Sequence, residues 1–279
     1  MTPAKTSDRA ALLQAASTAQ QRGDHDGAVA ALDRLLRHAP GDGQALLMRG
    51  VLALAQGEAE AAVGYLRRAV EALVGEHADP VALANLGIAL ASCGRADEAE
   101  QVLRQAVEQP GSPPQAAYNL GHLLAARGAD DEAVTWLQAA VSAAPAYTRA
   151  SCELAAAHLR AEEAARAESV LRAALAHDAE HPVALHHLGL ALRMLGRHEE
   201  ACACFQRARP ALGPDRELML GLGASLQETG KVEEALAVYR ELLAVLPDAY
   251  GQVLRALSSA SHGCFDLRPS RLRALLGLA

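Results

Sequence analysis

The chain has 279 residues, of which 51% are hydrophobic but only 3% aromatic, and alanine and leucine supply most of the hydrophobic side chains. Both are strong helix formers, so the composition predicts an all-helical protein. A formal net charge of -7 argues against binding to nucleic acid. The sequence has no run of 18 apolar residues, which argues against a membrane-spanning protein.

Residues 1–8 form a polar N-terminal segment that leads directly into a predicted helix. They contain no apolar stretch typical of a signal peptide, so we expect a cytoplasmic protein. The five cysteines are odd in number and form no CxxC pair, and we expect them to be reduced and mostly buried. They are Cys93, Cys152, Cys202, Cys204 and Cys264.

An alanine then recurs along the chain at a nearly constant interval. Five of the six intervals are 34 residues and one is 37. The positions are Ala28, Ala62, Ala99, Ala133, Ala167, Ala201 and Ala235. A period of this length indicates stacked helix-turn-helix units.

When the repeats are aligned on this alanine, other equivalent positions, or columns, show the same period. Twelve residues before the alanine stands a Gly or Ala, which allows two helices to cross closely. Five residues before most of the alanines stands a glycine, where the first helix of each unit must end. These turn glycines are Gly23, Gly57, Gly94, Gly128, Gly196 and Gly230. Prolines mark helix starts at Pro80, Pro114 and Pro182.

These columns resemble the tetratricopeptide repeat, most clearly in "AAYNLGHLLAARGADDEAVTWLQAAVSAAP". The resemblance implies a right-handed superhelical α-solenoid, in which the first helices of successive repeats line a concave groove and the second helices form the back. Seven repeats are expected within residues 9–249. Their ranges are 9–42, 43–76, 80–113, 114–147, 148–181, 182–215 and 216–249.

Two repeats depart from the pattern. The 37-residue interval predicts a longer surface loop around Gly75–Asp79, with a local change of superhelix pitch as the alternative. In the fifth repeat Glu162 replaces the turn glycine and His158 occupies a usually apolar position. The neighbouring repeats keep their phase, so we expect a hairpin here with its turn near 161–164 and with lower local stability.

The period ends at residue 249, and residues 250–279 form a C-terminal segment. A helix over 250–260 is expected to cap the last repeat, followed by a loop and a short amphipathic helix starting at Pro269. That last helix could fold back on the array or project as a docking element. It could also join two copies of the chain in a homo-oligomer.

The sequence shows no signature of catalysis. It lacks GxxxxGK[ST], GxSxG and HExxH, so we expect a protein that is not an enzyme and holds no cofactor. Histidines concentrate in the middle of the chain, but His186 and His187 are adjacent on a helix and point about 100° apart. A metal site is therefore not expected, and a groove that changes charge with pH is the favoured alternative.

The groove is the predicted partner-binding surface. With the repeats aligned in this way, one column of first-helix positions faces the groove. It contains Asn85 and Asn119, whose amides can pair with any peptide unit. The resemblance supports this role, because several tetratricopeptide proteins grip a peptide backbone with inward asparagines. The predicted contact residues are Asn85, Tyr118, Asn119, His122, Glu153, Arg160, His186, His187 and Arg193.

The resulting hypothesis is a non-catalytic scaffold that binds a peptide segment or protein surface in its concave groove. Two alternative hypotheses belong to other functional classes. The chain could be the substrate-recruiting subunit of a two-part enzyme such as a sulfotransferase or glycosyltransferase, or a self-assembling structural protein.

Overall fold

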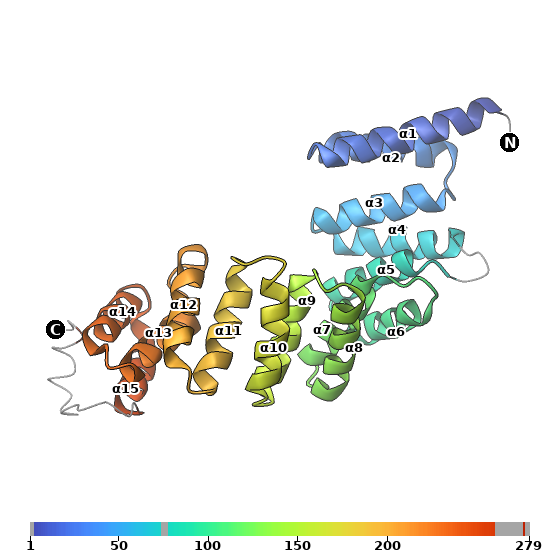
Figure 1. Cartoon of the computed structure of the whole chain (residues 1–279). Coiled ribbons are helices and arrows are strands. Elements are labelled where there is room, and N and C mark those ends of the chain that lie inside the picture. The colour runs from blue at the N-terminus through green and yellow to red at the C-terminus, as the bar shows by residue number, and fades with distance from the viewer. Residues whose placement is uncertain (1–2, 74–77, 260–275, 277–279) are drawn as a thin grey trace. The chain divides into compact units, whose positions relative to one another are not determined.

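Figure 1 shows the chain as a computed structural model, in which residues 3–73, 78–259 and 276 are described. Every regular element in these residues is a helix. The chain forms two compact units, Met1–Ala140 and Val141–Ala279. The predicted all-α array of helix-turn-helix repeats is confirmed within each unit.

Unit 1 is built from antiparallel helical hairpins, each of which packs on the next. Its helices are α1 (Pro3–Gln21), α2 (His25–His38), α3 (Gly43–Ala55), α4 (Ala59–Ala72), α5 (Pro80–Ser92), α6 (Ala96–Glu108), α7 (Pro114–Ala126) and α8 (Asp130–Ala143). The last of these extends three residues past the end of the unit.

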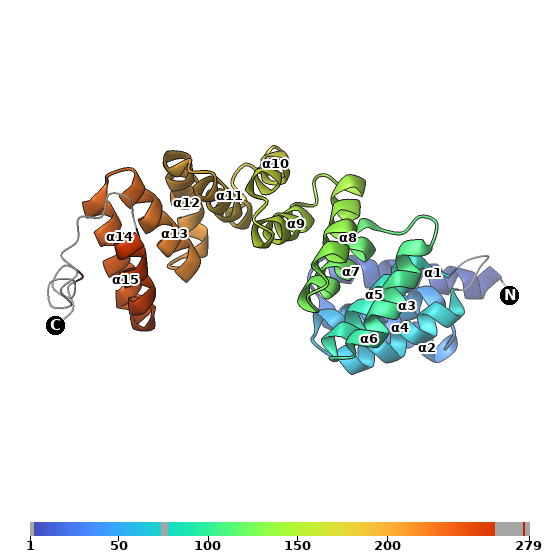
Figure 2. The same cartoon turned by 90° about the horizontal axis from the view of Figure 1, so that it is seen from below.

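Unit 2 continues the same pattern and ends in a single helix. Its elements are α9 (Thr148–Arg160), α10 (Ala164–Leu175), α11 (Pro182–Met194), α12 (His198–Leu212), α13 (Arg216–Glu228), α14 (Val232–Val245), the 3₁₀ turn η1 (Pro247–Ala249) and α15 (Tyr250–Ser259). Figure 2 shows α15 beside α13, which it contacts. The capping helix expected over 250–260 is therefore present to Ser259, and the helix expected from Pro269 lies outside the described residues.

Four of the first helices begin after a residue whose side chain accepts hydrogen bonds from their exposed backbone N–H groups, whereas α7 and α9 have no such side-chain cap. The side chains of Asp42, Asp79 and Asp215 accept hydrogen bonds from the first turns of α3, α5 and α13. In α11 the same position holds His181, whose Nδ1 accepts from the Ala184 N–H at 3.2 Å. Prolines occupy the first positions of α5, α7 and α11, as predicted.

The turn inside each hairpin uses a left-handed residue. All six predicted turn glycines have positive φ, for example 76° at Gly128. In the fifth repeat this conformation falls on Glu162, with φ of 59°. The predicted hairpin is thus confirmed, because α9 ends at Arg160 and α10 begins at Ala164.

Glycines of the first helices allow the closest approach between the two helices of a hairpin. A Cβ placed on Gly87 would lie 2.5 Å from Cγ of Leu103, and one on Gly189 would lie 2.6 Å from Cε1 of Phe205. The large residue of the second helix therefore fills the space that a side chain would take. The core that results is continuous through the first and second helices of unit 2, and it supports the surface described next.

Candidate functional site

A trough runs over the first helices of unit 2. It consists of two adjoining cavities with volumes of ≈ 330 and ≈ 480 Å³, which share Leu190, Arg193 and Glu217 in their walls. The smaller cavity is also lined by Ala156, Leu159, Arg160, His187 and Met194. The larger is also lined by Asp215, Arg216, Leu220, Gly221, Ala224, Gln252 and Ala256. We call the residues of both cavities the unit 2 trough.

The floor of the trough is apolar. Leu190 is 8% exposed and belongs to the hydrophobic core of unit 2, and Leu159 and Leu220 pack against that core while remaining partly accessible. Met194 is 42% exposed, which is unusual for a large hydrophobic side chain in this chain. A thioether at this position can adapt to the shape of a ligand.

The walls of the trough carry charge. Arg160 ends α9 and Arg193 lies in the last turn of α11, and both side chains are exposed. Arg216 is engaged by Asp248 and Gln252. Asp215 is engaged as the N-cap of α13, where it accepts from the Leu218 N–H at 2.9 Å.

Arg193 differs in its contacts from Arg172 of α10 and from Arg197, which precedes α12. Arg197 binds Glu168 and Glu200, and Arg172 binds the same two carboxylates. In the part of the chain that the structure describes, no hydrogen bond or ion pair joins the Arg193 side chain to another residue. Its guanidinium is therefore available to a ligand.

The two adjacent histidines occupy different environments. His187 lines the smaller cavity, whereas His186 is 8% exposed and its ring lies 6.0 Å from that of Phe205. Burial lowers the pKa of both, despite the opposing effect of Asp215 on His186 and of Glu217 on His187. Both rings are therefore neutral near pH 7.

The predicted contacts in unit 1 lie on α5 and α7. The Asn85 side chain donates from Nδ2 to the Val81 carbonyl at 2.8 Å, within its own helix. Tyr118 is only 2% exposed and stacks on the exposed His122 ring, with centroids 5.9 Å apart. Asn119 is partly buried on the same helix.

Three of the predicted residues, Arg160, His187 and Arg193, thus come together in one cavity. Glu153 and His186 are on the same helices but do not line it. Met194 and Glu217 also line the trough and were not among the predicted contact residues. The repeat period could have found Met194, which stands 34 residues after Arg160.

The cysteines and histidines form no reactive or metal-binding centre among the residues described. No group of three or more His, Cys, Asp or Glu side chains there could hold a metal ion. Cys152, Cys202 and Cys204 are buried and not in disulfides. Burial raises the pKa of Cys152 to about 12, which keeps it a protonated, unreactive thiol.

Comparison with known protein families is consistent with an array of helical hairpins. Patterns described as tetratricopeptide repeats match residues 13–76, 84–148 and 180–248. The chain belongs to the tetratricopeptide repeat family. The unmatched stretch 149–179 contains most of the fifth repeat, the one with Glu162 in the turn. Tetratricopeptide repeats are protein–protein interaction modules.

Solved tetratricopeptide structures share the fold at low sequence identity. The pilF structure from Pseudomonas aeruginosa is 18% identical, with a TM-score of 0.69, over 77% of this chain and 96% of that one. PilW, a type IV pilus biogenesis factor, is 19% identical, with a TM-score of 0.65, over 78% and 98%. YrrB, a TPR protein with an unusual peptide-binding site, is 20% identical, with a TM-score of 0.53, over 67% and 95%.

No curated protein matches this tetratricopeptide chain in sequence. Among its described helices, none combines the length and the apolar character needed to cross a membrane.

Proposed function

We propose that this tetratricopeptide protein is a non-catalytic scaffold that binds an extended peptide segment or protein surface along its first helices. The observation that carries the proposal is the unit 2 trough. It joins an apolar floor to polar walls, and each of its cavities is within the range of ordinary ligand pockets, about 300–1,000 Å³.

The trough is better suited to binding a peptide than to catalysing a reaction. Binding surfaces gain most of their affinity from a few well-packed anchors, and Leu190 and Met194 offer contacts to such an anchor. The walls contain no cysteine. The buried thiols of unit 2 suit a reducing, cytoplasmic environment.

Two features support the choice of a protein partner. YrrB shares the fold and is described as having a peptide-binding site. The net charge of -7 disfavours a nucleic acid partner. We include no membrane partner in the proposal.

The proposed function can be tested by substitutions that fill the trough with larger side chains. Ala156 and Ala224 line the two cavities and are partly exposed, so Ala156→Leu with Ala224→Leu narrows both. The probe is a phage library of random eight-residue peptides, selected on the wild type and on the variant. We expect peptides that the wild type enriches to be lost on the variant.

A matched control separates blocked binding from altered folding. Ala203→Leu with Ala237→Leu makes the same change on exposed positions of α12 and α14. This control should select the same peptides as the wild type, with equal helical circular dichroism in all three proteins. Peptides retained equally by the trough variant would disprove the proposal.

The contacts of unit 1 are a separate part of the proposal. Tyr118 is buried, so its truncation would disturb packing, whereas Asn119→Ala and His122→Ala change accessible side chains. We expect these two changes to weaken partner binding while the helical signal stays intact. Unchanged binding would remove unit 1 from the binding surface and leave the trough untouched.

A further inference from the structure

We propose that the unit 2 trough selects peptides in which an acidic side chain lies within two residues of a large aliphatic side chain. This inference rests on the proposed function and names the ligand chemistry of the same surface. It follows from the pairing, in one cavity, of an apolar floor with two arginines from neighbouring repeats.

The aliphatic requirement comes from the floor. In the smaller cavity Leu159, Leu190 and Met194 present hydrocarbon and thioether surface to the space above them. Covering this surface with an aliphatic side chain removes apolar area from water on both partners. A polar side chain in its place would lose hydration without gaining a hydrogen bond from these three residues.

The acidic requirement comes from the two guanidinium groups. Arg160 and Arg193 lie in the last turns of the first helices of consecutive repeats and line the same cavity, so one carboxylate can lie near both. The Arg193 side chain has no hydrogen bond or ion pair with any described residue. A guanidinium can bind a carboxylate with two parallel hydrogen bonds, which makes arginine selective for this group.

Charged side chains of both signs line the smaller cavity. Glu217, from α13, is the one carboxylate in its wall, against Arg160 and Arg193. His187 is neutral near pH 7 because burial lowers its pKa. The Arg193 guanidinium therefore favours an anionic group in the ligand, and Glu217 opposes it.

The larger cavity adds little to this selectivity. Arg216 is already bound to Asp248, and the carboxylate of Asp215 already caps α13. Its floor of Leu220, Ala224 and Ala256 is apolar and small. It can accommodate the chain that continues from the anchored pair of residues.

The experiment extends the peptide selection to charge variants of the wall. The full-length wild type, the double variant Arg160→Gln/Arg193→Gln and the single variant Glu217→Gln are each selected against the same random eight-residue library. We expect wild-type selections to be enriched in Asp or Glu within two residues of Leu, Ile, Val, Met or Phe. The arginine variant should lose the acidic preference and keep the aliphatic one, and Glu217→Gln should strengthen the acidic preference.

A peptide enriched by the wild type is then synthesised with its acidic residue unchanged or replaced by the amide. We expect this replacement to weaken wild-type binding about tenfold at low salt, as for a charge pair that is partly desolvated. Binding to Arg160→Gln/Arg193→Gln should change less than about twofold on the same replacement. The matched control is Arg34→Gln/Arg37→Gln, which removes two exposed arginines of α2 and should behave as the wild type.

The outcomes separate this inference from the proposed function. Peptides that depend on the trough but carry no acidic residue, or an acidic preference that survives in the arginine variant, would overturn the inference alone. If the wild type enriches no peptide that the filled-trough variant loses, the proposed function fails and this inference fails with it.

Discussion

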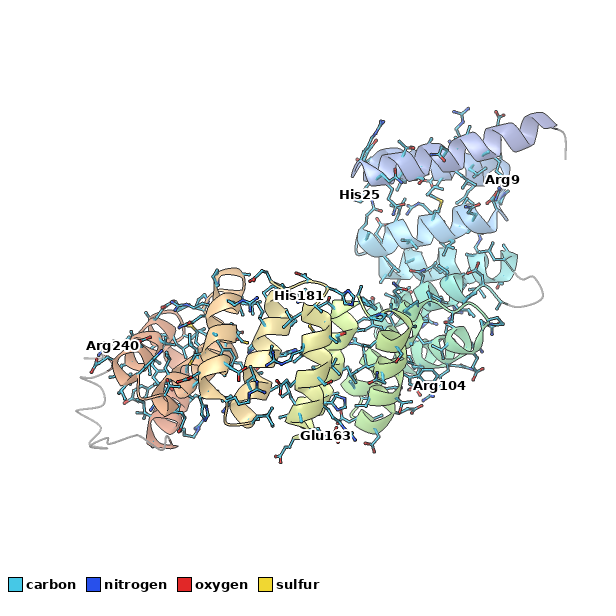
Figure 3. All side chains as sticks on the ribbon, viewed as in Figure 1. Arg9, His25, Arg104, Glu163, His181 and Arg240 are labelled. Atoms are coloured by element: carbon cyan, nitrogen blue, oxygen red, sulfur yellow. The ribbon has the colours of Figure 1, made fainter. Side chains whose placement is uncertain are left out.

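Nδ1 of His158 lies 2.7 Å from Oε2 of Glu163, across the turn that joins α9 to α10. His158 is 5% exposed and stands where other repeats bury Leu90, Leu124 and Leu192. The hydrogen bond from His158 is the main reason why the pKa of Glu163 is lowered. Glu163 lies at the opposite end of the unit 2 helices from His181 (Figure 3). A polar ring is tolerated in this core because a partner stands five residues further along the chain.

Glu162, in the same turn, adopts a conformation that favours glycine. Its φ is 59°, and a left-handed non-glycine residue costs roughly 1–2 kcal/mol. Glu162→Gly should therefore stabilise the protein by about 0.5–1 kcal/mol after the entropic cost of glycine. Urea unfolding followed by circular dichroism measures the change.

The reverse change tests the same reasoning. A Cβ on Gly128 would meet nothing within 4 Å, and φ there is 76°. Gly128→Ala should therefore destabilise by about 1 kcal/mol through its backbone alone. If Glu162→Gly destabilised the protein and Gly128→Ala left its stability unchanged, this explanation of the turn would be wrong.

The fifth repeat should open more readily than the fourth. It combines the strained turn at Glu162 with the buried polar side chains of Ser151 and His158. Local openings occur where packing is weakest, so amides of α9 and α10 should exchange faster than those of α7 and α8. Native-state hydrogen exchange with mass spectrometry checks this order, and equal protection of the two repeats would show the prediction to be wrong.

Stability should fall as the pH drops below about 6.5, the ordinary pKa of histidine. Burial lowers the pKa of His186 and His187, and the charge of His186 lowers that of His187 further, while Asp215 opposes the effect on His186 and Glu217 opposes it on His187. Between the folded and unfolded pKa values the unfolded chain binds more protons, so acid favours unfolding. The stabilisation is thus complete above the unfolded value and decreases as the pH falls toward the folded one.

His186→Phe tests this pH dependence. His186 packs near Phe205 and its Nε2 is buried without a hydrogen bond among the described residues, so an apolar ring fits the site. We expect a smaller loss of thermal stability between pH 7 and pH 5.5 than in the wild type. His177→Gln, at an exposed position, serves as the control, and an undiminished loss in His186→Phe would rule out this site as a cause.

Ala133→Leu tests the close crossing of the fourth hairpin. Ala133 is fully buried, and its carbonyl oxygen would lie 3.1 Å from a Cβ on Gly121. Extra methylenes there should force the helices apart and cost roughly 1–3 kcal/mol. Denaturant unfolding measures the cost against Ala139→Leu, an exposed position of the same helix that should be nearly neutral.

The sequence by itself determined the repeat architecture. A 34-residue period placed small residues at every helix crossing, and the turn glycines and helix-starting prolines fixed where the helices end and begin. A hairpin forms even over residues 148–175, which contain no glycine or proline to end a helix. Periodicity succeeds here because each repeat is specified by its own residues and those of its neighbours.

Only the tertiary structure decided which side chains share a site. Arg160, His187 and Arg193 were found from their columns, but the joining of their cavity to Glu217 depends on how consecutive first helices pack. The contribution of Gln252 and Ala256 could not be predicted, because α15 lies beyond the end of the period. The position of a residue in the repeat predicts which face of its helix it lies on. Its burial, the cavities it lines and the charges it pairs with depend on the side chains of the adjacent helices.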